Sequence, residues 1–446
     1  MNSRVLIVVM VLSSFSLVGA EFDWLFQAGG IGHDKARAVA TDSDGNVYAT
    51  GEFTGVARFG GSELKSEGAL DFCLVKIDSK GKLVWAKSFG GAKIERGYAV
   101  ATDRERNVVV TGHFQSPTLT IGSTVLTNRG DYDVFVVKYA ADGAVFWARS
   151  AGGPAYDYGH GVAIDEAGRI YVSGAIRGGG QFDSGESTEA GSVGPFVAVY
   201  SEEGRLLWNR TMTGKGSGSA HEIAVTADGR VRVGGYVSGT LDFGGQSLRV
   251  TRGRDIFAAA MDARGKVLWV RQFGGAADGL VSGIGVDAGG SCFVSGMFKG
   301  TAVFDGESRA SAGDNDLFVA RLDEAGRPLW WHVAGGKGTD YALGLAVDGA
   351  GNCLVTGETT GDVEFAGRAL KAIGRRDLYV AGFAPDGRLS WVKQAGGTLN
   401  GLSYGVSVSP TGRVIFAGAF SGELGAGGLR LNSHGSNDLL VGSIVE

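Results

Sequence analysis

The sequence has few of the residues and motifs that mark several protein classes. Among its 446 residues there are 6 prolines and 3 cysteines, and no C-x-x-C or H-E-x-x-H motif occurs. The low cysteine count excludes a disulfide scaffold, and the motif search yields no common redox or zinc site. Cys73, Cys292 and Cys353 stand in apolar runs, so we expect buried, reduced thiols.

Excess charge and long apolar runs are also scarce. The formal net charge is -5 at pH 7 and no dense basic block occurs, which argues against nucleic acid as a partner. One apolar run, "VLIVVMVL", follows Arg4 and leads to small residues before Glu21. It is shorter than the ~20 residues of a membrane span and is typical of a signal peptide. We therefore expect residues 1–20 to be removed by cleavage after Ala20, giving a secreted or periplasmic protein without a membrane span.

Glycine is abundant, with 78 residues, and it belongs to a repeat. Four short segments rich in β-branched and aromatic residues recur between evenly spaced tryptophans, and Gly, Asp or Asn bounds each segment. Such segments are typical of strands and hairpins, and no window has a sustained helical period, so the sequence predicts an all-β protein. The tryptophans recur every 61 or 62 residues, at Trp24, Trp85, Trp147, Trp208, Trp269, Trp330 and Trp391.

This repeat predicts a seven-bladed β-propeller of four-stranded antiparallel blades, occupying residues 21–446 as a single domain. The first segment of each repeat has a small residue at one position, as suits the crowded innermost strand, and the tryptophan segment is then outermost. The mature chain starts on a tryptophan segment and ends on a third segment. We therefore expect residues 22–28 to pair with residues 438–444, so that the N-terminal strand closes the ring.

Two stretches, "ERGYAVATDRERNVVVTGHF" and "DYALGLAVDGAGNCLVTGE", resemble the bacterial beta-propeller repeat (SBBP-type) family. The likeness covers nearly all of the mature chain. The hairpin "FVARLDEAGRPLW" is similar to the tryptophan-docking hairpin of quinoprotein-type propellers. The resemblance implies an exported bacterial propeller with related blade packing. It implies no quinone cofactor and transfers no catalytic residue, since a fold does not establish a function.

Most loops that lead from the outer strand into the next inner strand carry an acidic residue. Two interpretations remain open: these side chains cap turns, or they form a ring that attracts cations. The residues concerned are Asp34, Glu95, Asp157, Asp278 and Asp340.

One position in the first segment of each repeat, the expected innermost strand, holds a different residue type in most repeats, while the positions beside it hold similar residues. We call it the template position. It holds Arg37, Tyr98, His160, His221, Ser282, Leu343 and Tyr404, and Glu222 stands beside it where the other repeats have Ala or Gly. We predict a ligand site at the channel mouth, lined by Arg37, Tyr98, His160, His221, Glu222 and Tyr404. The alternative is that these residues lie at a solvated rim, where the sequence has varied without a functional role. Strand alternation would turn His221 and Glu222 to opposite faces.

Two histidines are too few for a zinc site, so we expect neither a metal nor another cofactor. A polar or anionic ligand is favoured, with binding that tightens below pH ~6.5 as the imidazoles gain protons. We interpret the protein as a monomeric binding or scaffold module with an unknown protein or glycan partner and no catalytic residue. The alternative is a carbohydrate-active lyase or hydrolase that uses the Tyr98–His160–His221 arc, which would require several groups of strongly shifted pKa in one pocket.

Overall fold

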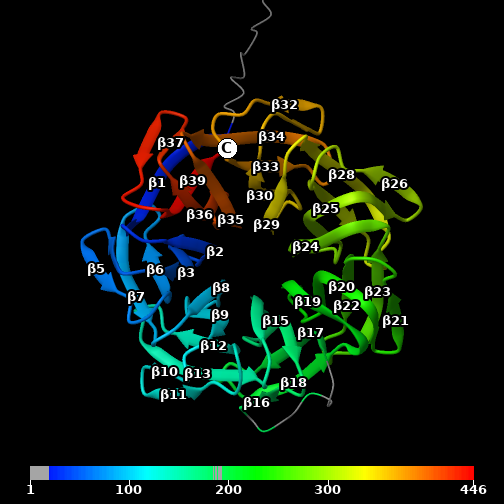
Figure 1. Cartoon of the computed structure of the whole chain (residues 1–446), viewed down its shortest axis with the longest axis horizontal. Coiled ribbons are helices and arrows are strands. Elements are labelled where there is room, and N and C mark those ends of the chain that lie inside the picture. The colour runs from blue at the N-terminus through cyan, green and yellow to red at the C-terminus, as the bar shows by residue number, and fades with distance from the viewer. Residues whose placement is uncertain (1–19, 184, 186–187, 189–192) are drawn as a thin grey trace, which may run out of the picture.

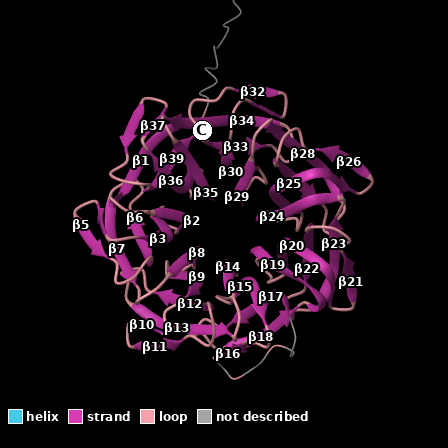
Figure 2. Cartoon of the chain, in the orientation of Figure 1, coloured by secondary structure: helices cyan, strands magenta, loops and turns pink. Residues whose placement is uncertain are grey.

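The computed structural model describes residues 20–183, 185, 188 and 193–446. The predicted signal peptide therefore lies outside the described residues, apart from Ala20. Within the described part the chain forms strands and turns and no helix (Figure 2), so the all-β prediction is confirmed. None of these residues forms a helix that is long and apolar enough to cross a membrane.

Each sheet has four main strands, which follow one another in chain order except in the sheet β35-β36-β39-β1, whose fourth strand comes from the start of the chain. The first strands are β2 (Lys35–Thr41), β8 (Glu95–Thr102), β14 (Tyr158–Ile164), β19 (Thr213–Val225), β24 (Ala276–Val286), β29 (Tyr341–Val347) and β35 (Asn400–Val408). The second strands are β3 (Val47–Phe53), β9 (Val108–Phe114), β15 (Ile170–Arg177), β20 (Val231–Phe243), β25 (Cys292–Phe304), β30 (Cys353–Thr359) and β36 (Val414–Ser421).

The remaining main strands complete each sheet. The third strands are β6 (Asp71–Ile77), β12 (Asp133–Tyr139), β17 (Val193–Tyr200), β22 (Asp255–Met261), β27 (Asp316–Leu322), β33 (Asp377–Phe383) and β39 (Asp438–Val445). The fourth strands carry the repeated tryptophans: β7 (Leu83–Phe89), β13 (Val145–Gly152), β18 (Leu206–Thr211), β23 (Val267–Phe273), β28 (Pro328–Gly336), β34 (Leu389–Gly397) and β1 (Glu21–Gly30).

Short strands lie at the outer rim of the sheets, where several of them pair with a fourth strand. They are β4 (Val56–Phe59), β5 (Ser62–Lys65), β10 (Thr118–Ile121), β11 (Thr124–Thr127), β16 (Gln181–Phe182), β21 (Gln246–Arg249), β26 (Glu307–Ala310), β31 (Val363–Phe365), β32 (Arg368–Leu370), β37 (Glu423–Ala426) and β38 (Leu429–Asn432). Figure 1 shows the sheets arranged around a common centre, with first strands such as β2, β8, β24 and β35 nearest to it.

The hydrophobic core lies between neighbouring sheets. The third strand β6 is buried along its whole length, because both faces of its sheet are covered. Phe72 of β6 stacks on Phe89 with ring centroids 4.1 Å apart and meets Phe135 of β12 at 5.6 Å. A sheet that packs on both faces needs apolar residues at successive positions, which explains segments such as "DFCLVKI". The three cysteines are buried and unpaired, as expected.

The repeated tryptophan joins one sheet to the next. The indole nitrogen of Trp147 donates a hydrogen bond of 2.9 Å to the carbonyl of Glu202, in the hairpin turn of the following sheet. Gly204 of that turn has φ +77°, and a Cβ there would lie 2.6 Å from the ring. Only glycine therefore fits beneath the tryptophan. Trp330 repeats this contact with Pro385 at 3.0 Å, so the tryptophan-docking resemblance describes a real interface.

The ends of the described chain meet in one sheet. Strand β1 pairs antiparallel with β39, from Phe22 opposite Ile444 to Ala28 opposite Leu439. The order of the main strands there is β35, β36, β39 and β1. The fourth strand of this sheet thus comes from the start of the chain, and its third strand comes from the end.

Candidate functional site

The variable template position has a structural definition: it is the extra residue of a bulge in each first strand. In β8, Gly97 and Ala99 pair with the consecutive residues Gly112 and Thr111 of β9, which leaves Tyr98 without a partner. A bulge leaves one residue unpaired and turns its side chain out of the regular alternation. The same register shift occurs at Arg37, His160, His221, Ser282, Leu343 and Tyr404.

This bulge changes the expected orientation of Glu222. Ala220 and Glu222 pair with the consecutive residues Gly235 and Gly234. Strict alternation therefore does not continue through His221, so the bulge removes the premise on which His221 and Glu222 were expected to face opposite sides. In the described part of the protein, the side chain of Glu222 forms no hydrogen bond or ion pair with the other predicted site residues, whereas its Cα would lie 3.1 Å from a Cβ on Gly161 of β14.

The structure brings three of the predicted residues into direct ring contact. Tyr98 meets His160 edge to face at 5.0 Å between ring centroids. His160 then stacks on His221 of the next first strand, at 4.5 Å and an angle of 15°. The predicted meeting of the two imidazoles across the sheet boundary is thus observed.

Arg37 and Tyr404 extend this row on the side of Tyr98. The guanidinium of Arg37 lies 4.7 Å from the ring centre of Tyr98 and 5.8 Å from that of Tyr404. Both of its hydrogen bonds go to the buried carboxylate of Glu52, at 2.6 Å each. Arg37 is therefore neutralised within the protein, and the prediction that it holds a ligand together with the imidazoles loses its main support.

A cavity of about 280 Å³ lies beside the row of rings. Its aromatic lining includes Tyr98, His160 and His221, which the sequence predicted as site residues. Four further rings that the sequence analysis missed complete the aromatic wall: His113, Tyr132, Tyr158 and Tyr236. His113 contacts three of the tyrosines, with centroid distances of 5.1 Å to Tyr98, 4.8 Å to Tyr132 and 5.0 Å to Tyr158.

The remaining lining residues are Arg96, Arg177 and Ser219, and the sequence analysis missed these as well. Buried polar atoms of all three, and both ring nitrogens of His113, have no hydrogen-bond partner in the described part of the protein. Ser219 is 3% exposed and His113 is 1% exposed. A buried polar group without a partner costs about 1–3 kcal/mol, so four such residues around one cavity make it the candidate site.

Burial sets the protonation of the imidazoles. It lowers the pKa of His113 to about 3, with Arg96 and Arg37 adding to the effect. It lowers the pKa of His221 to about 4, helped by Arg254, and the pKa of His160 falls well below its usual value because of burial and of His221. All three imidazoles are therefore neutral at pH 5.5 to 8. This removes the basis for binding that tightens below pH ~6.5.

The acidic loop residues cap backbone groups. Asp34 accepts hydrogen bonds from the amides of Gly30 and Thr54, at 2.8 and 3.2 Å, and it is fully buried. Glu95, Asp157 and Asp340 repeat this pattern with two amides each. Asp278 instead binds the guanidinium of Arg254. Of the two open interpretations, turn capping fits the structure.

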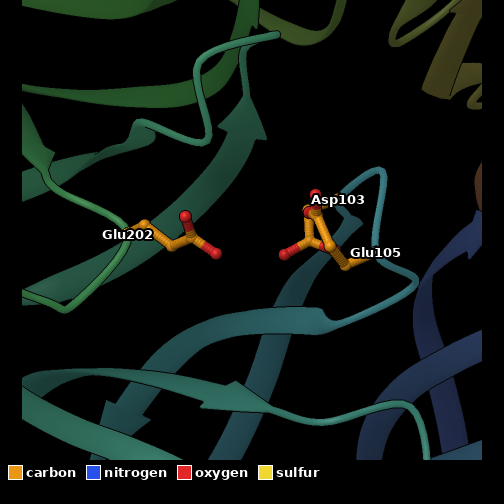
Figure 3. Close-up of side chains that lie close together, drawn as sticks. All are labelled: Asp103, Glu105 and Glu202. Carbon is orange, nitrogen blue, oxygen red and sulfur yellow. The ribbon is translucent and has the colours of Figure 1, made fainter.

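A second acidic group lies away from the candidate site. Asp103, Glu105 and Glu202 each offer a carboxylate oxygen, and these atoms lie within 4.8 Å of one another. Figure 3 shows the three side chains. The ammonium of Lys138, however, lies 3.0 Å from both Asp103 and Glu202. A protein cation thus already bridges two of the three carboxylates, as a structural contact between two sheets.

Faint signals for the missed residues existed in the sequence. Arg96 and Ser219 stand two positions before the bulge residues Tyr98 and His221, at a position that also varies among the other repeats, which have Lys35, Tyr158, Leu280, Tyr341 and Leu402. His113 pairs directly with Arg96 in the neighbouring strand, at the position where β3 has Glu52. Comparing strand-paired positions among repeats would have found these residues.

Comparison with known proteins agrees with the repeat architecture. Residues 147–178 match the family model of the beta-propeller repeat (SBBP). The fold and the repeat together define a β-propeller repeat protein, and the chain carries the repeat of this family.

Two curated proteins are similar to the chain, one described as WD repeat-containing and the other as a regulatory protein. The chain is 21% identical over 439 residues to an uncharacterized WD repeat-containing protein of Acanthamoeba polyphaga mimivirus, covering 77% of this chain and 32% of that protein. It is 24% identical over 389 residues to the regulatory protein FlaEY of Caulobacter vibrioides, covering 78% and 38%. The chain thus spans about a third of the length of the curated relatives it matches.

Among solved structures, Sqt1 from Chaetomium thermophilum is similar at 13% identity. The match covers 94% of this chain and 86% of that chain, with a TM-score of 0.43. At this score the similarity carries no argument about function.

Proposed function

We propose that the protein is an exported, closed ring of seven four-stranded blades that works as a binding scaffold. The pairing of β1 with β39 supports the closure, because it joins the two ends of the described chain in one sheet. The tryptophan contacts between successive sheets support a rigid ring. Export rests on the signal-peptide pattern of residues 1–20, and intact-mass measurement of secreted protein beginning at Glu21 would test it.

The proposed binding site is the cavity beside β8, β14 and β19. One observation carries this proposal: four polar side chains line the cavity with buried atoms that have no partner in the described protein. Such groups are costly to the fold and gain hydrogen bonds when a ligand enters. The loops and bulges around the cavity vary between repeats, as suits recognition on a fixed scaffold.

A screen of glycans and peptides by ligand-observed NMR tests the binding role. Binders should be found for the purified mature protein, and the double variant His160→Ala, His221→Ala should weaken them about tenfold, since both rings line the cavity. The control is Phe146→Ala, which changes an exposed ring on β13. A screen without binders, or binders with equal affinity for both proteins, would contradict the proposal.

The second candidate is a carbohydrate-active lyase or hydrolase. His113, His160 and His221 favour it, because their pKa values are all shifted by burial within one cavity. The lowered pKa values of about 3 for His113 and about 4 for His221, however, make these imidazoles weak general bases. Against it, no carboxylate lines the cavity, and Glu222 has its pKa raised to about 8 by burial outside that lining. Assays for new reducing ends or unsaturated products on polysaccharides distinguish the two functions.

A further inference from the structure

The charge of the cavity lining is unbalanced. Arg96 and Arg177 supply two guanidiniums, and the ten lining residues include no Asp or Glu. Neither guanidinium forms an ion pair with a described residue, whereas the nearby Arg37 and Arg254 are each bound to a carboxylate. Both arginines are half-buried, and charges that are partly removed from water favour an opposite charge as partner, so this lining is complementary to an anion.

The anion that fits carries a limited charge. Arg177 lies close enough to Asp157 to act on the pKa of that carboxyl, whose side chain accepts a hydrogen bond of 2.6 Å from the backbone amide of Arg177. Burial raises the pKa of Asp157 to about 7, so at pH 7 this carboxyl is partly ionised and offsets a fraction of the positive charge. A single carboxylate matches what remains, and a guanidinium binds a carboxylate through paired hydrogen bonds.

The other polar groups suit hydroxyls. His113 is neutral, so one ring nitrogen donates and the other accepts, and the Ser219 hydroxyl does both. A sugar hydroxyl also donates and accepts, so it satisfies either partner. An aromatic acid would leave these groups without hydrogen bonds.

The aromatic wall and the volume limit the size of the ligand. The rings of Tyr98, Tyr158 and Tyr236 line the cavity with His160 and His221, and aromatic faces pack against flat apolar surfaces such as one side of a pyranose. About 280 Å³ is at the small end of the roughly 300–1,000 Å³ found for ligand pockets. The cavity therefore accepts one six-membered ring with its substituents.

We propose that this cavity binds a sugar acid of the hexuronate class, as a single residue or as the end of an acidic glycan. Arg96 and Arg177 compensate the carboxylate, His113 and Ser219 bind hydroxyls, and the tyrosine rings pack on the pyranose. The inference rests on the proposed function, since it names the ligand class of the same site.

Isothermal titration calorimetry at pH 7 with four probes tests the ligand class: D-glucuronate, D-glucose, benzoate and inorganic phosphate. D-Glucuronate should bind at least about tenfold more tightly than D-glucose, the gain expected from a charge-assisted hydrogen bond. It should also bind more tightly than benzoate, which lacks hydroxyls, and than phosphate, which carries more charge and has no ring.

Single variants assign the roles. Arg96→Gln and Arg177→Gln should each weaken D-glucuronate about tenfold while changing D-glucose less than about twofold. Arg58→Gln is the matched control, because Arg58 is exposed on the outer strand β4. Ser219→Ala should weaken both sugars and leave the melting temperature unchanged or higher, since Ser219 has no hydrogen-bond partner in the described protein.

The outcomes separate this inference from the proposed function. Equal affinity for D-glucose and D-glucuronate overturns the acidic ligand, and tighter binding of benzoate or phosphate overturns the sugar acid. Binding of D-glucuronate that survives both arginine substitutions unchanged overturns the assigned site. If none of the four probes binds while the glycan and peptide screen finds a cavity ligand, the ligand class is wrong and the scaffold function stands. If both experiments find nothing, both proposals fail.

Discussion

The first strands β8, β14 and β19 and the first strands β24, β29 and β35 share one backbone and differ in chemistry. Each has its bulge at the same template position. On one side the bulge residues are Tyr98, His160 and His221, which touch one another. On the other side they are Ser282, Leu343 and Tyr404. The shared backbone thus sets the position of the unpaired residue, and the residue type at that position differs among the repeats.

The position after the bulge sets β19 apart from other first strands. A Cβ on Gly283 would lie 2.7 Å from the Cβ of Leu345, and one on Gly344 would lie 2.7 Å from the carbonyl oxygen of Tyr404. Gly161 of β14, on the cavity side, is equally crowded, because a Cβ there would lie 2.6 Å from the Ser173 hydroxyl. In β19 the same position holds Glu222, so a carboxyl group marks this one strand of the cavity side.

The largest expected effect tests the shared scaffold. Trp147→Ala, on the cavity side, and Trp330→Ala, on the opposite side, should each lower the free energy of unfolding by about 3–5 kcal/mol, since each removes a packed indole. Denaturant unfolding measures both. Phe146→Ala and Leu329→Ala are the neighbouring controls, because these side chains are 58% and 55% exposed. A loss confined to one of the two tryptophans would show that the two sides are not equivalent.

His113→Phe should stabilise the cavity side. The variant keeps a ring against Tyr98, Tyr132 and Tyr158 and removes two nitrogens that lack partners, a gain of about 1 kcal/mol at pH 7. The folded-state pKa is lowered to about 3, so between pH 6.5 and 3 the unfolded chain takes up a proton that the folded protein does not. The wild type therefore loses stability as the pH falls through this range.

The advantage of His113→Phe should accordingly rise by about 2 kcal/mol at pH 5, since each unit below 6.5 is worth about 1.4 kcal/mol. Thermal unfolding of both proteins at pH 7 and pH 5 measures it, with the exposed Tyr156→Phe as control. A difference that stays constant with pH would mean that His113 is protonated in the folded protein.

Much of the fold was predictable from the sequence, because each structural contact leaves the same residue pattern in successive repeats. The tryptophan spacing, the turn glycines and runs such as "DFCLVKI" reflect contacts made again in each sheet. All-β structure and repeated four-strand order are therefore confirmed by the structure. The number of blades and the closed ring remain proposals.

The candidate site was predictable only in part. Tyr98, His160 and His221 were found because they occupy one register position. Arg96, His113 and Ser219 were missed because they reach the cavity from other strand positions, which a comparison within one strand does not include. The pairing of Arg37 with Glu52 was missed for the same reason, since their contact crosses from β2 to β3.

Glu222→Gln tests the half-buried carboxyl group that follows the bulge of β19. Burial raises the pKa of Glu222 to about 8, so its contribution to stability is present below about pH 4.5 and is lost as the pH rises through 8. The variant should match the wild type at pH 4.5 and be more stable by on the order of 2 kcal/mol at pH 8 to 9. Glu63→Gln makes the same chemical change at an exposed site and should have no such pH dependence. Equal stabilities of wild type and Glu222→Gln at both pH values would place Glu222 in contact with solvent.

The smallest effect is expected on the side opposite the cavity. Leu343 is the bulge residue of β29, without a pairing partner in β30, and it is only partly buried. Leu343→His should change the free energy of unfolding by no more than about 0.5 kcal/mol, because substitutions away from the packed core and its hydrogen bonds usually stay within that limit. The same variant should leave D-glucuronate binding unchanged, since it reproduces the residue type of His160 without Arg96, Arg177 or the wall of rings. Denaturant unfolding and calorimetry measure the two effects. A loss of several kcal/mol would mean that the bulge residue helps to hold the ring together, and the difference between the two sides would then be structural and not a matter of ligand chemistry.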